Sequence, residues 1–313
     1  MGKYCFGIDV GGTTIKCGLF QTDGLLVDKW EIVTRTQNAG ENILPDIAKT
    51  VEEKLSEKAI PKEEVVGIGV GIPGPVMHGK VPVAVNLHWG ETDIKGILEE
   101  LTGIPVSAGN DANVAALGEM WKGGGEGHKS VVVVTLGTGV GGGIIIDGKI
   151  VEGSHGAGGE IGHAHVTDEI TDPCNCGNYG CLEQVASATG VVRLAKEELA
   201  KLGPDEKSRL QDVQKLTCRA VFDEAKEGDE VALRIVDRFA RYLGTALSVF
   251  ATVVDPEVFV IGGGVSKAGD ILIDVVSKYY KSMAFPACQN IPIVLAKLGN
   301  DAGIYGSARL VLD

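Results

Sequence analysis

The sequence has no surplus of positive charge. Its 313 residues contain 29 Lys and Arg against 42 Asp and Glu, which gives a formal net charge of −13 at pH 7. Because a phosphate backbone is bound by a basic face, this balance argues against a nucleic-acid partner. The sequence also lacks any apolar segment approaching the roughly 20 residues that span a bilayer, so we expect no membrane partner.

Export and lipidation signals are missing as well. Met1-Gly2-Lys3 leads into an apolar run that is interrupted at Asp9, unlike the apolar region of a signal peptide. Gly2 invites a myristoylation motif, but position 6 is Phe6 rather than Ser or Thr. These absences predict a cytoplasmic enzyme.

Glycine, in contrast, is abundant. The 45 glycines have no fixed period, which excludes collagen, and many form short runs beside apolar strands. Such runs indicate backbone that approaches a ligand closely. Apolar residues make up 44% and charged residues 23%, as in ordinary globular proteins, and the chain is long enough for two domains.

The order of predicted elements occurs twice along the chain. Alternating apolar residues and turn signals predict strands, and apolar residues at helical spacing predict helices. The first half gives strands at 4–10, 15–21, 25–33, 65–72 and 104–108, with helices from 43, at 93–101 and at 112–121. The second half gives strands at 130–136, 141–146, 149–151, 258–261 and 293–298, with helices that include 229–253, 270–280 and 302–312.

Both halves therefore read β-hairpin-β-α-β-α-β-α. A duplicated α/β unit of this kind is the plan of the two-lobed actin-like ATPase fold, of the ribonuclease H-like class. We expect a small N-terminal lobe over residues 1–121, joined by the C-terminal helix at 301–313. The larger lobe is expected to cover residues 122–300 and to include a zinc-knuckle insertion at 153–185.

Each half has a glycine-rich turn between its first two strands. In Asp9-Val10-Gly11-Gly12-Thr13-Thr14, bare backbone N–H groups and two hydroxyls can surround an anion while Asp9 holds Mg²⁺, directly or through water. The counterpart is Leu136-Gly137-Thr138-Gly139-Val140. One such turn is weak evidence, and Lys16 is misplaced for a Walker motif. Two turns in equivalent places indicate a polyphosphate held from both sides.

A third glycine run, Gly262-Gly263-Gly264, ends a strand and opens a helix. A nucleoside or a phosphate can lie close to the backbone at such a place, so Gly263 and Gly264 are candidate nucleotide contacts. Together the three runs supply the contacts that a nucleotide and its phosphates need.

Asn110 and Asp111 follow a predicted strand and precede a predicted helix. Asp111 could simply cap that helix. Alternatively, it could accept the proton of a substrate hydroxyl that attacks a γ-phosphorus. An ordinary carboxylate suffices for this step, because the transition state is loose and the hydroxyl loses its proton late. Asn110 can both donate and accept hydrogen bonds, which suits adjacent hydroxyls of a sugar.

A cluster of cysteines and a histidine lies in the inserted segment. Cys174, Cys176 and Cys181 fall within one short stretch, and His163 lies just upstream. Three thiolates and an imidazole favour a closed tetrahedral zinc site, with Gly177 inside the turn around the ion. A disulfide is the alternative, but a Cys174–Cys176 bridge would be strained and we expect a reducing compartment.

Two glutamates flank this cluster. Glu160 precedes His163 by three residues, and Glu183 follows Cys181 by two. A metal clamped between them would fix the loop so that both carboxylates face a ligand, whereas a purely structural zinc would need neither. The alternative is that both are solvated surface carboxylates.

With these motifs in order, the chain resembles the ROK family of repressors and sugar kinases, and is most similar to its ATP-dependent glucokinases. The resemblance covers nearly the whole length. It rests on D-V-G-G-T-T, G-I-P-G-P-V, G-N-D-A-N-V-A-A-L-G-E, T-L-G-T-G-V-G-G-G, G-G-E-I-G-H and C-N-C-G-N-Y-G-C-L-E. The last two motifs together are highly specific.

The resemblance implies roles for the candidate residues. Asp111 would be the general base toward the 6-hydroxyl of a hexose. The sugar hydroxyls would be bound by Asn110, Glu160, His163 and Glu183. A structural zinc would be held by His163, Cys174, Cys176 and Cys181. The ATP phosphates, bridged by Mg²⁺, would contact Gly11, Gly12, Thr13 and Thr138.

Three functions are weighed. The first is phosphorylation of glucose by ATP to glucose 6-phosphate, with N-acetylmannosamine, fructose or mannose as alternative substrates. A sugar-sensing regulator of the same family would need an N-terminal helix-turn-helix, but the nucleotide-binding strand begins at Tyr4 and no basic recognition helix precedes it. A non-catalytic actin-like assembly protein would need neither the Asn110-Asp111 pair nor the zinc insertion. The resemblance also implies a homodimer.

Overall fold

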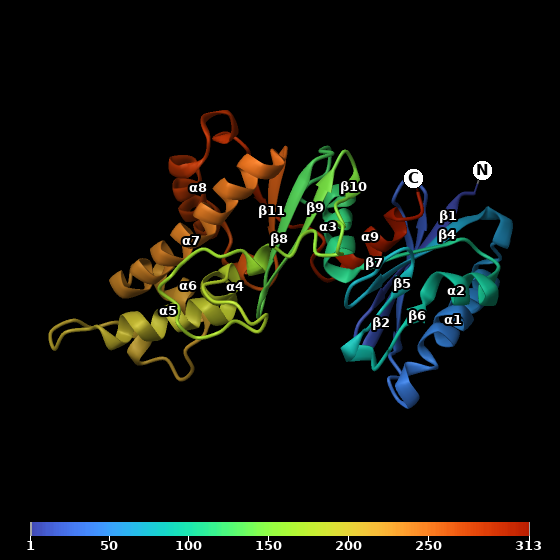
Figure 1. Cartoon of the computed structure of the whole chain (residues 1–313), viewed down its shortest axis with the longest axis horizontal. Coiled ribbons are helices and arrows are strands. Elements are labelled where there is room, and N and C mark those ends of the chain that lie inside the picture. Colours follow the sequence, from blue (N-terminus) through green and yellow to red (C-terminus); the bar gives the residue numbers. More distant parts are fainter. Residues whose placement is uncertain (1, 313) are drawn as a thin grey trace. The chain divides into compact units, whose positions relative to one another are not determined.

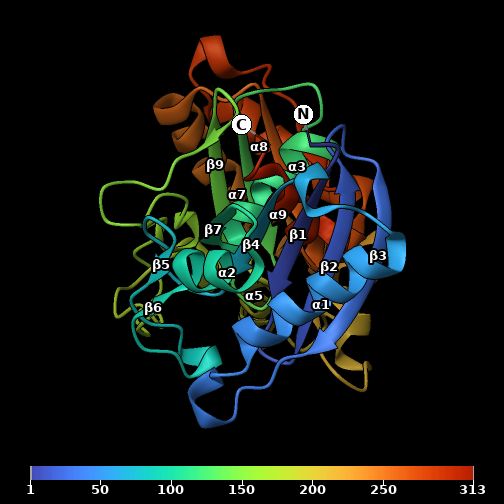
Figure 2. The ribbon, with the colours of Figure 1, turned by 90° about the vertical axis from the view of Figure 1, so that its right-hand side faces the viewer.

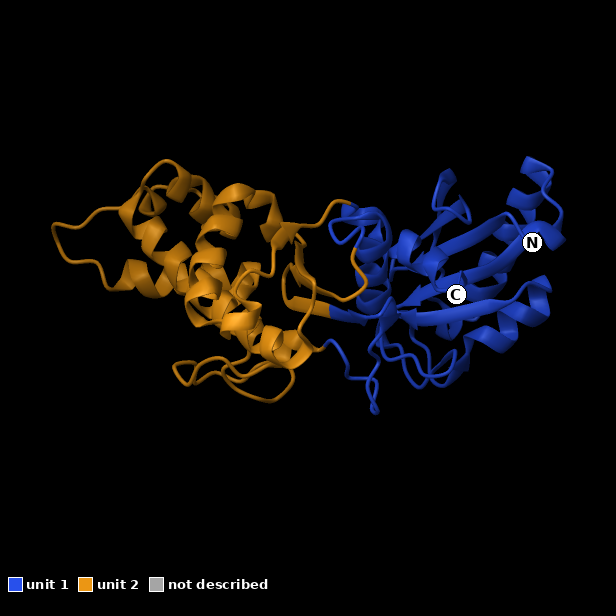
Figure 3. Cartoon of the chain, turned by 90° about the horizontal axis from the view of Figure 1, so that it is seen from above, with its two compact units in different colours: residues 1–127, 143–159, 298–313 blue, residues 128–142, 160–297 orange. Residues whose placement is uncertain are grey.

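The computed structural model describes residues 2–312, which fold as two compact units (Figure 1). The first unit contains the chain up to Gly127, Gly143–Gly159 and the chain from Leu298 onward. The second contains His128–Gly142 and Glu160–Lys297, and Figure 3 distinguishes the two by colour. The chain therefore passes between the units four times.

A five-stranded sheet with the order β3-β2-β1-β4-β7 forms the centre of the first unit. β1 pairs antiparallel with β2 and parallel with β4, and β4 pairs parallel with β7. The carboxyl ends of β1, β4 and β7 therefore lie side by side, with Asp9 opposite Gly71 and Ile72 opposite Asn110. The strands are β1 (Tyr4–Val10), β2 (Thr14–Gln21), β3 (Leu26–Val33), β4 (Val65–Ile72) and β7 (Val106–Asn110).

Helices cover both faces of this sheet. α1 (Ile43–Lys58) and α2 (Ile94–Thr102) share one buried cluster with the sheet and lie on its near side in Figure 2. α9 (Ala302–Arg309) packs on β1 and β4 from the other face, and α3 (Asp111–Lys122) packs on α9.

Alternation of side chains along β1 explains this division. Phe6 and Ile8 are buried with α1, whereas Cys5 is buried with α9. Gly7 and Gly69 also lie under α9, where an added Cβ would overlap its backbone carbonyl groups. The two glycines thus let the C-terminal helix lie directly on the sheet.

The second sheet repeats the first, with the order β10-β9-β8-β11-β12. β8 and β12 both pair in parallel with β11, and β10 pairs antiparallel with β9. The unit boundary passes through β9. The identical order confirms the duplicated α/β fold predicted from the sequence. The strands are β8 (Val131–Leu136), β9 (Val140–Ile146), β10 (Lys149–Ile150), β11 (Val258–Gly262) and β12 (Ile293–Leu295).

The helices of the second unit gather around α7, which packs against four others. Apolar residues at helical spacing form a stripe along α7, which is buried at Ala232, Val236, Phe239, Leu243 and Leu247 and half-buried at Phe250. The helices are α4 (Leu182–Ala186), α5 (Ala188–Ala200), α6 (Cys218–Lys226), α7 (Glu230–Val254) and α8 (Asp270–Met283).

Some elements differ from the prediction. β5 (Lys80–Val81) and β6 (Thr92–Asp93) form a small sheet that the sequence does not predict, because two-residue strands carry no periodic pattern. α9 ends at Arg309 rather than at 312. Among residues 2–312, none of the helices combines the length and the apolar character that a bilayer crossing requires.

Candidate functional site

The carboxyl ends of three parallel strands gather the candidate residues of the first unit. Asp9 lies near the end of β1, Asn110 ends β7, and Asp111 begins α3. The loop after β4 joins this group, because Asn110 Nδ2 donates to the Gly74 carbonyl oxygen at 3.0 Å. In open α/β sheets, ligands bind beyond the carboxyl ends of the strands.

Asn110, rather than Asp111, caps α3. Its Oδ1 accepts from the backbone N–H groups of Ala112 and Asn113 at 3.0 and 3.1 Å. The Asp111 carboxylate is half-buried in the first turn, with its Oδ1 2.8 Å from the Ala112 nitrogen. A helix N-terminus favours negatively charged side chains, and Asp111 lies in the first turn of α3 beside the asparagine that caps it.

Asp9 is half-buried beside a lysine. Lys16 Nζ lies 4.0 Å from Asp9 Oδ2 and donates to the Asn300 carbonyl oxygen at 3.0 Å. Burial raises the pKa of Asp9 above its usual value, while the positive charge of Lys16 lowers it. A cation stabilises a partly desolvated carboxylate, so Asp9 fits the predicted role as a Mg²⁺ ligand. Lys16 is a neighbour that motif matching missed, since it pairs with Asp9 across the hairpin.

The first glycine-rich turn is fixed by the strand that follows it. Thr34, just after β3, donates through Oγ1 to the Gly11 carbonyl oxygen at 2.6 Å and through its backbone N–H to Thr13 at 2.9 Å. Gly12 and Thr13 at the tip are exposed. The backbone is thus held in shape while its tip stays accessible to an anion.

The equivalent turn of the second unit, between β8 and β9, is bonded to the cysteine-rich insertion. Glu183 Oε2 accepts from the Val140 backbone N–H at 3.0 Å. Gly139 admits no side chain, because a Cβ there would overlap the Glu183 carboxylate. Thr189 Oγ1 donates to the Thr138 carbonyl oxygen at 2.8 Å. The predicted phosphate turn and the predicted sugar ligand Glu183 are therefore in direct contact.

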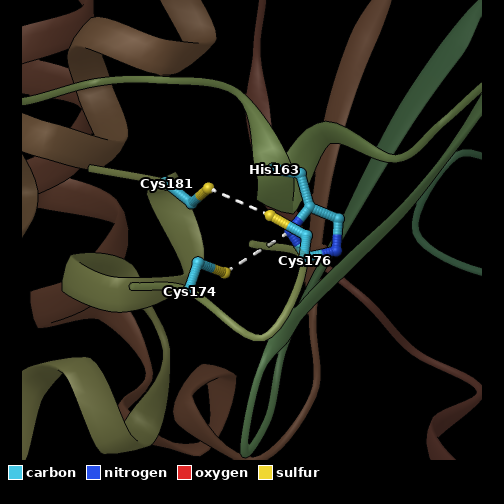
Figure 4. Close-up of side chains that lie close together, drawn as sticks. All are labelled: His163, Cys174, Cys176 and Cys181. Carbon is cyan, nitrogen blue, oxygen red and sulfur yellow. Dashed lines mark hydrogen bonds between the residues drawn. The ribbon is translucent and has the colours of Figure 1, made fainter. Parts of the chain in front are cut away.

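The four predicted metal ligands converge in the second unit (Figure 4). Their donor atoms all lie within 4.8 Å of one another. Cys174 Sγ is 3.7 Å from His163 Nδ1, and Cys176 Sγ is 3.6 Å from Cys181 Sγ. With Zn–S bonds of about 2.3 Å, two ligands of a tetrahedral site stand about 3.5–3.8 Å apart, so this donor set fits zinc. The sulfur separation is too long for a disulfide, and all seven cysteines are free.

The thiols of this cluster differ in acidity. The backbone N–H of Asn178 lowers the pKa of Cys176, whereas burial and the neighbouring thiols raise the pKa of Cys181 to about 12. Thiols ligate zinc as thiolates, so a bound cation favours deprotonation of the buried Cys181.

Gln184 organises the end of the cluster. Cys181 is the N-cap of α4, and the Gln184 Oε1 atom accepts from its backbone N–H at 3.1 Å. Gln184 Nε2 donates to the Asp172 carbonyl oxygen at 2.9 Å, which ties the acidic loop to the helix. Sequence reasoning missed this residue, although the spacing from Cys181 to Gln184 is that of a capping box.

His163 faces two ways. Its Nδ1 points to Cys174, and its Nε2 lies 4.0 Å from Glu160 Oε2. The second unit thus brings Glu160, His163 and Glu183 around one metal-ligand cluster. His165 lies outside the ligand set, with its ring bonded to the Tyr179 carbonyl oxygen at 2.9 Å and to Asp168 at 3.1 Å.

A cavity of about 680 Å³ opens beside the third glycine run. Gly264 and Val265 line one side, and Cys218 and Phe222 of α6 line another. The volume is typical of small-molecule sites. Gly263 has φ +82° and lies against the end of β8, so a side chain there would meet the Leu136 backbone.

The sequence and the fold of this chain are similar to those of known proteins. The ROK family profile matches residues 5–313. The glucokinase of Halalkalibacterium halodurans is 46% identical over 315 residues, covering 99% of this chain and 95% of that protein. The ROK hexokinase of Thermus thermophilus matches with a TM-score of 0.79 and 32% identity over 97% of each chain. The ROK glucokinase of Streptomyces griseus, in complex with glucose and AMPPNP, matches with a TM-score of 0.71 and 33% identity over 98% of each chain.

Proposed function

The chain belongs to the ROK family and is a hexose kinase, and from this premise we propose that it is a glucokinase that transfers the γ-phosphoryl group of Mg-ATP to the 6-hydroxyl of glucose. The observation that carries the proposal is the 46% identity with a glucokinase over nearly the whole of both chains. The carboxylate needed for the chemistry is present at the start of α3.

Asp111 is the general base of the proposed reaction. As the glucose O6 atom attacks the γ-phosphorus, its proton passes to the Asp111 carboxylate. The bond between the γ-phosphorus and the bridging oxygen breaks, and ADP leaves with that electron pair. Because this transition state is loose, positioning of O6 matters more than the strength of the base. Capping of α3 by Asn110 supports this role, since the Asn110 side chain accepts from two backbone N–H groups of the first turn and Asp111 is not the N-cap.

The sugar hydroxyls are assigned to Asn110, Glu160, His163 and Glu183. Support comes from the contacts of His163 and Glu183 with Cys174, because a fixed loop aims these side chains without loss of entropy on binding. Zinc held by His163, Cys174, Cys176 and Cys181 would supply that rigidity, and with four protein ligands it has no open position for water. Asn110 offers the second N–H of its amide, because the bond to Gly74 uses one.

ATP is assigned to the glycine runs. Support comes from the exposed tip of the first turn, from the cavity beside Gly264 and from the AMPPNP bound to the Streptomyces griseus relative. Mg²⁺ is assigned to Asp9. The phosphate contacts are Gly11, Gly12, Thr13 and Thr14 in the first turn and Gly137, Thr138 and Gly139 in the second, with Gly263 and Gly264 near the nucleoside.

A hexose panel at fixed Mg-ATP tests the proposal. Glucose, N-acetylmannosamine, fructose and mannose are compared by ADP release, and NMR of the product locates the new phosphate ester. We expect the highest kcat/KM for glucose and a phosphate at C6. A higher kcat/KM for another hexose would identify that hexose as the preferred substrate. A lack of ADP release with all four sugars would contradict the assignment as a hexose kinase.

We also propose that the protein works as a cytoplasmic homodimer, as its family resemblance implies. Light scattering after gel filtration would measure the mass in solution. A mass near 65 kDa, about twice the 32.7 kDa of one chain, is expected. A mass of a single chain at micromolar concentration would contradict it.

A further inference from the structure

Glu119 is a buried carboxylate near the C-terminal end of α3, the helix that begins with Asp111. Its side chain and backbone are 3% exposed. Oε2 accepts from the Gly124 N–H and Oε1 from the Leu298 N–H, both at 2.8 Å. The Glu119 carbonyl oxygen accepts from Gly123 at 3.1 Å and from Gly125 at 2.9 Å. One residue therefore collects four backbone N–H groups from two segments that are distant in sequence.

Both segments adjoin places where the chain passes between the units. Gly123–Gly125 come shortly before the passage from Gly127 to His128, and Leu298 comes directly after the passage from Lys297. Glu119 thus hydrogen-bonds to first-unit residues that lie next to two of the four points where the chain passes between the units. Glycines stand next to both of them, Gly127 with φ +91° and Gly299 with φ +55°, backbone states that other residues rarely adopt.

The arrangement around Glu119 is specific. A Cβ at Gly123 would overlap the Glu119 carboxylate, so the loop can wrap this closely only with glycine there. Burying a carboxylate is costly unless its oxygens are hydrogen-bonded, and here two backbone groups do so. The Glu119 carbonyl oxygen ends the helix by accepting from the Gly123 N–H, and the carboxylate bonds Gly124 and Leu298 in addition.

We propose that Glu119 is a positioning residue that fixes two interunit passages to the helix carrying the catalytic base. The proposal rests on the proposed role of Asp111. With Gly124 and Leu298 both bonded to Glu119, the far end of α3 is held in place, and the orientation of Asp111 at the start of the same helix is held with it. Without Glu119 this helix would be less constrained, and O6 would meet Asp111 less often in reacting geometry.

The test begins with Glu119→Gln, which keeps the shape but replaces one acceptor oxygen by an N–H₂ group. The control is Glu126→Gln, an exposed residue on the same loop whose oxygen lies 3.8 Å from Lys122. We expect kcat to fall about tenfold or more in Glu119→Gln, while the hexose Kd measured without nucleotide changes less than about threefold. Backbone hydrogen exchange is expected to increase at 123–125 and at 298, with the rest of the first unit unchanged.

A second pair of variants removes the same bond from its other partner. Leu298→Pro deletes the donor N–H, and the φ of −80° at this position is compatible with proline. Leu298→Ala deletes the side chain but keeps the N–H. We expect kcat to be lower in Leu298→Pro than in Leu298→Ala, which keeps the proposal testable if Glu119→Gln fails to fold.

The outcomes separate this proposal from the glucokinase assignment. If the wild-type protein turns over no hexose, the glucokinase assignment fails, and the positioning role fails with it because there is no reaction to position. If the wild type is active, and either Glu119→Gln retains its kcat or Leu298→Pro equals Leu298→Ala, only the positioning role is overturned. A hexose Kd that weakens in step with kcat also overturns it, because a structural defect alone would then suffice.

Discussion

At the scale of single residues, Asn110 and Asp111 hold different positions at the junction of β7 and α3. Asn110 accepts two backbone N–H groups and donates to Gly74, so it holds both the helix end and the loop after β4. Asp111 is the first residue of the helix, and its Oδ1 lies 2.8 Å from the Ala112 nitrogen. Asparagine and aspartate are equally good caps, so the residue types alone leave open which of them ends the helix. The position at which β7 stops decides it.

Replacing Asp111 by asparagine should therefore remove the chemistry and spare the structure. We expect kcat to fall by about 10²–10⁴, the usual worth of a general base, while the hexose Kd stays within about threefold. Turnover in the ADP-release assay and calorimetric titration with glucose measure the two quantities. Asp93→Asn is the control, because Asp93 caps α2 by accepting from the Gly96 N–H. If Asp111→Asn keeps a kcat near that of the wild type, the Asp111 carboxylate is not the general base.

At the scale of an element, the cysteine-rich insertion joins a metal-ligand cluster to a glycine turn. Glu183 connects them, since one oxygen accepts from Val140 and the other lies 4.0 Å from Cys174 Sγ. The ligands were predictable from the types and spacing of Cys and His. The bond to the turn was not, because it depends on a glycine, Gly139, that makes room for the carboxylate.

Loss of one ligand should loosen the whole insertion. Cys176 is exposed, so Cys176→Ser costs little packing but removes a thiolate. We expect bound zinc, measured by atomic emission, to fall from about one per chain, and hexose affinity to weaken by about 10–100-fold. Cys288→Ser is the control, since the Cys288 thiol lies outside the cluster and bonds to the Ala251 carbonyl oxygen and Asp255. Full zinc content with unchanged affinity in Cys176→Ser would refute the structural role of the cluster.

The attachment of α1 to β3 should make stability depend on pH. Asp28 in β3 accepts from Lys58 and Lys54 of α1, and these hydrogen bonds lower the pKa of Asp28 to about 2. A lowered folded-state pKa stabilises the fold above the ordinary Asp pKa of about 4 and loses that stabilisation as the pH falls toward 2. We expect Asp28→Asn to lower Tm by roughly 2 °C at pH 7. The difference between wild type and variant should shrink below pH 4, and a difference independent of pH would contradict the assignment.

At the scale of the molecule, the repeated order of elements could be predicted from the sequence because it depends on local patterns. Strand periodicity, helix stripes and glycine turns each occupy a short window, and the two sheets share one strand order, as a duplicated unit requires. Contacts between segments that are distant in sequence could not be predicted in this way. Glu119 with Leu298 and Lys29 with Asp301 join the two ends of the chain. These pairs form only because the C-terminal segment folds back onto the first sheet, and no short stretch of sequence predicts that contact.

The return of the chain depends on a close contact between α3 and α9. A Cβ at Gly118 would overlap the Ala302 carbonyl oxygen, and a Cβ at Gly306 would overlap that of Val114. Because backbone atoms cannot move aside, an added methyl group must push α9 away from α3 and from the glycines of β1 and β4 beneath it. Overpacking of this kind costs about 1–3 kcal/mol.

We therefore expect Gly306→Ala to lower Tm by roughly 3–10 °C, although alanine alone favours a helix by about 1 kcal/mol over glycine. Gly90→Ala is the control, because a Cβ there meets no described atom within 4 Å, and we expect its Tm to stay within about 1 °C. Calorimetry of both variants measures the shift. Since α3 also carries Asp111, displacement of α9 should reduce kcat as well. If Gly306→Ala melts at or above the wild-type temperature, then α9 is not seated on α3 through these glycines, and the C-terminal helix does not position the catalytic one.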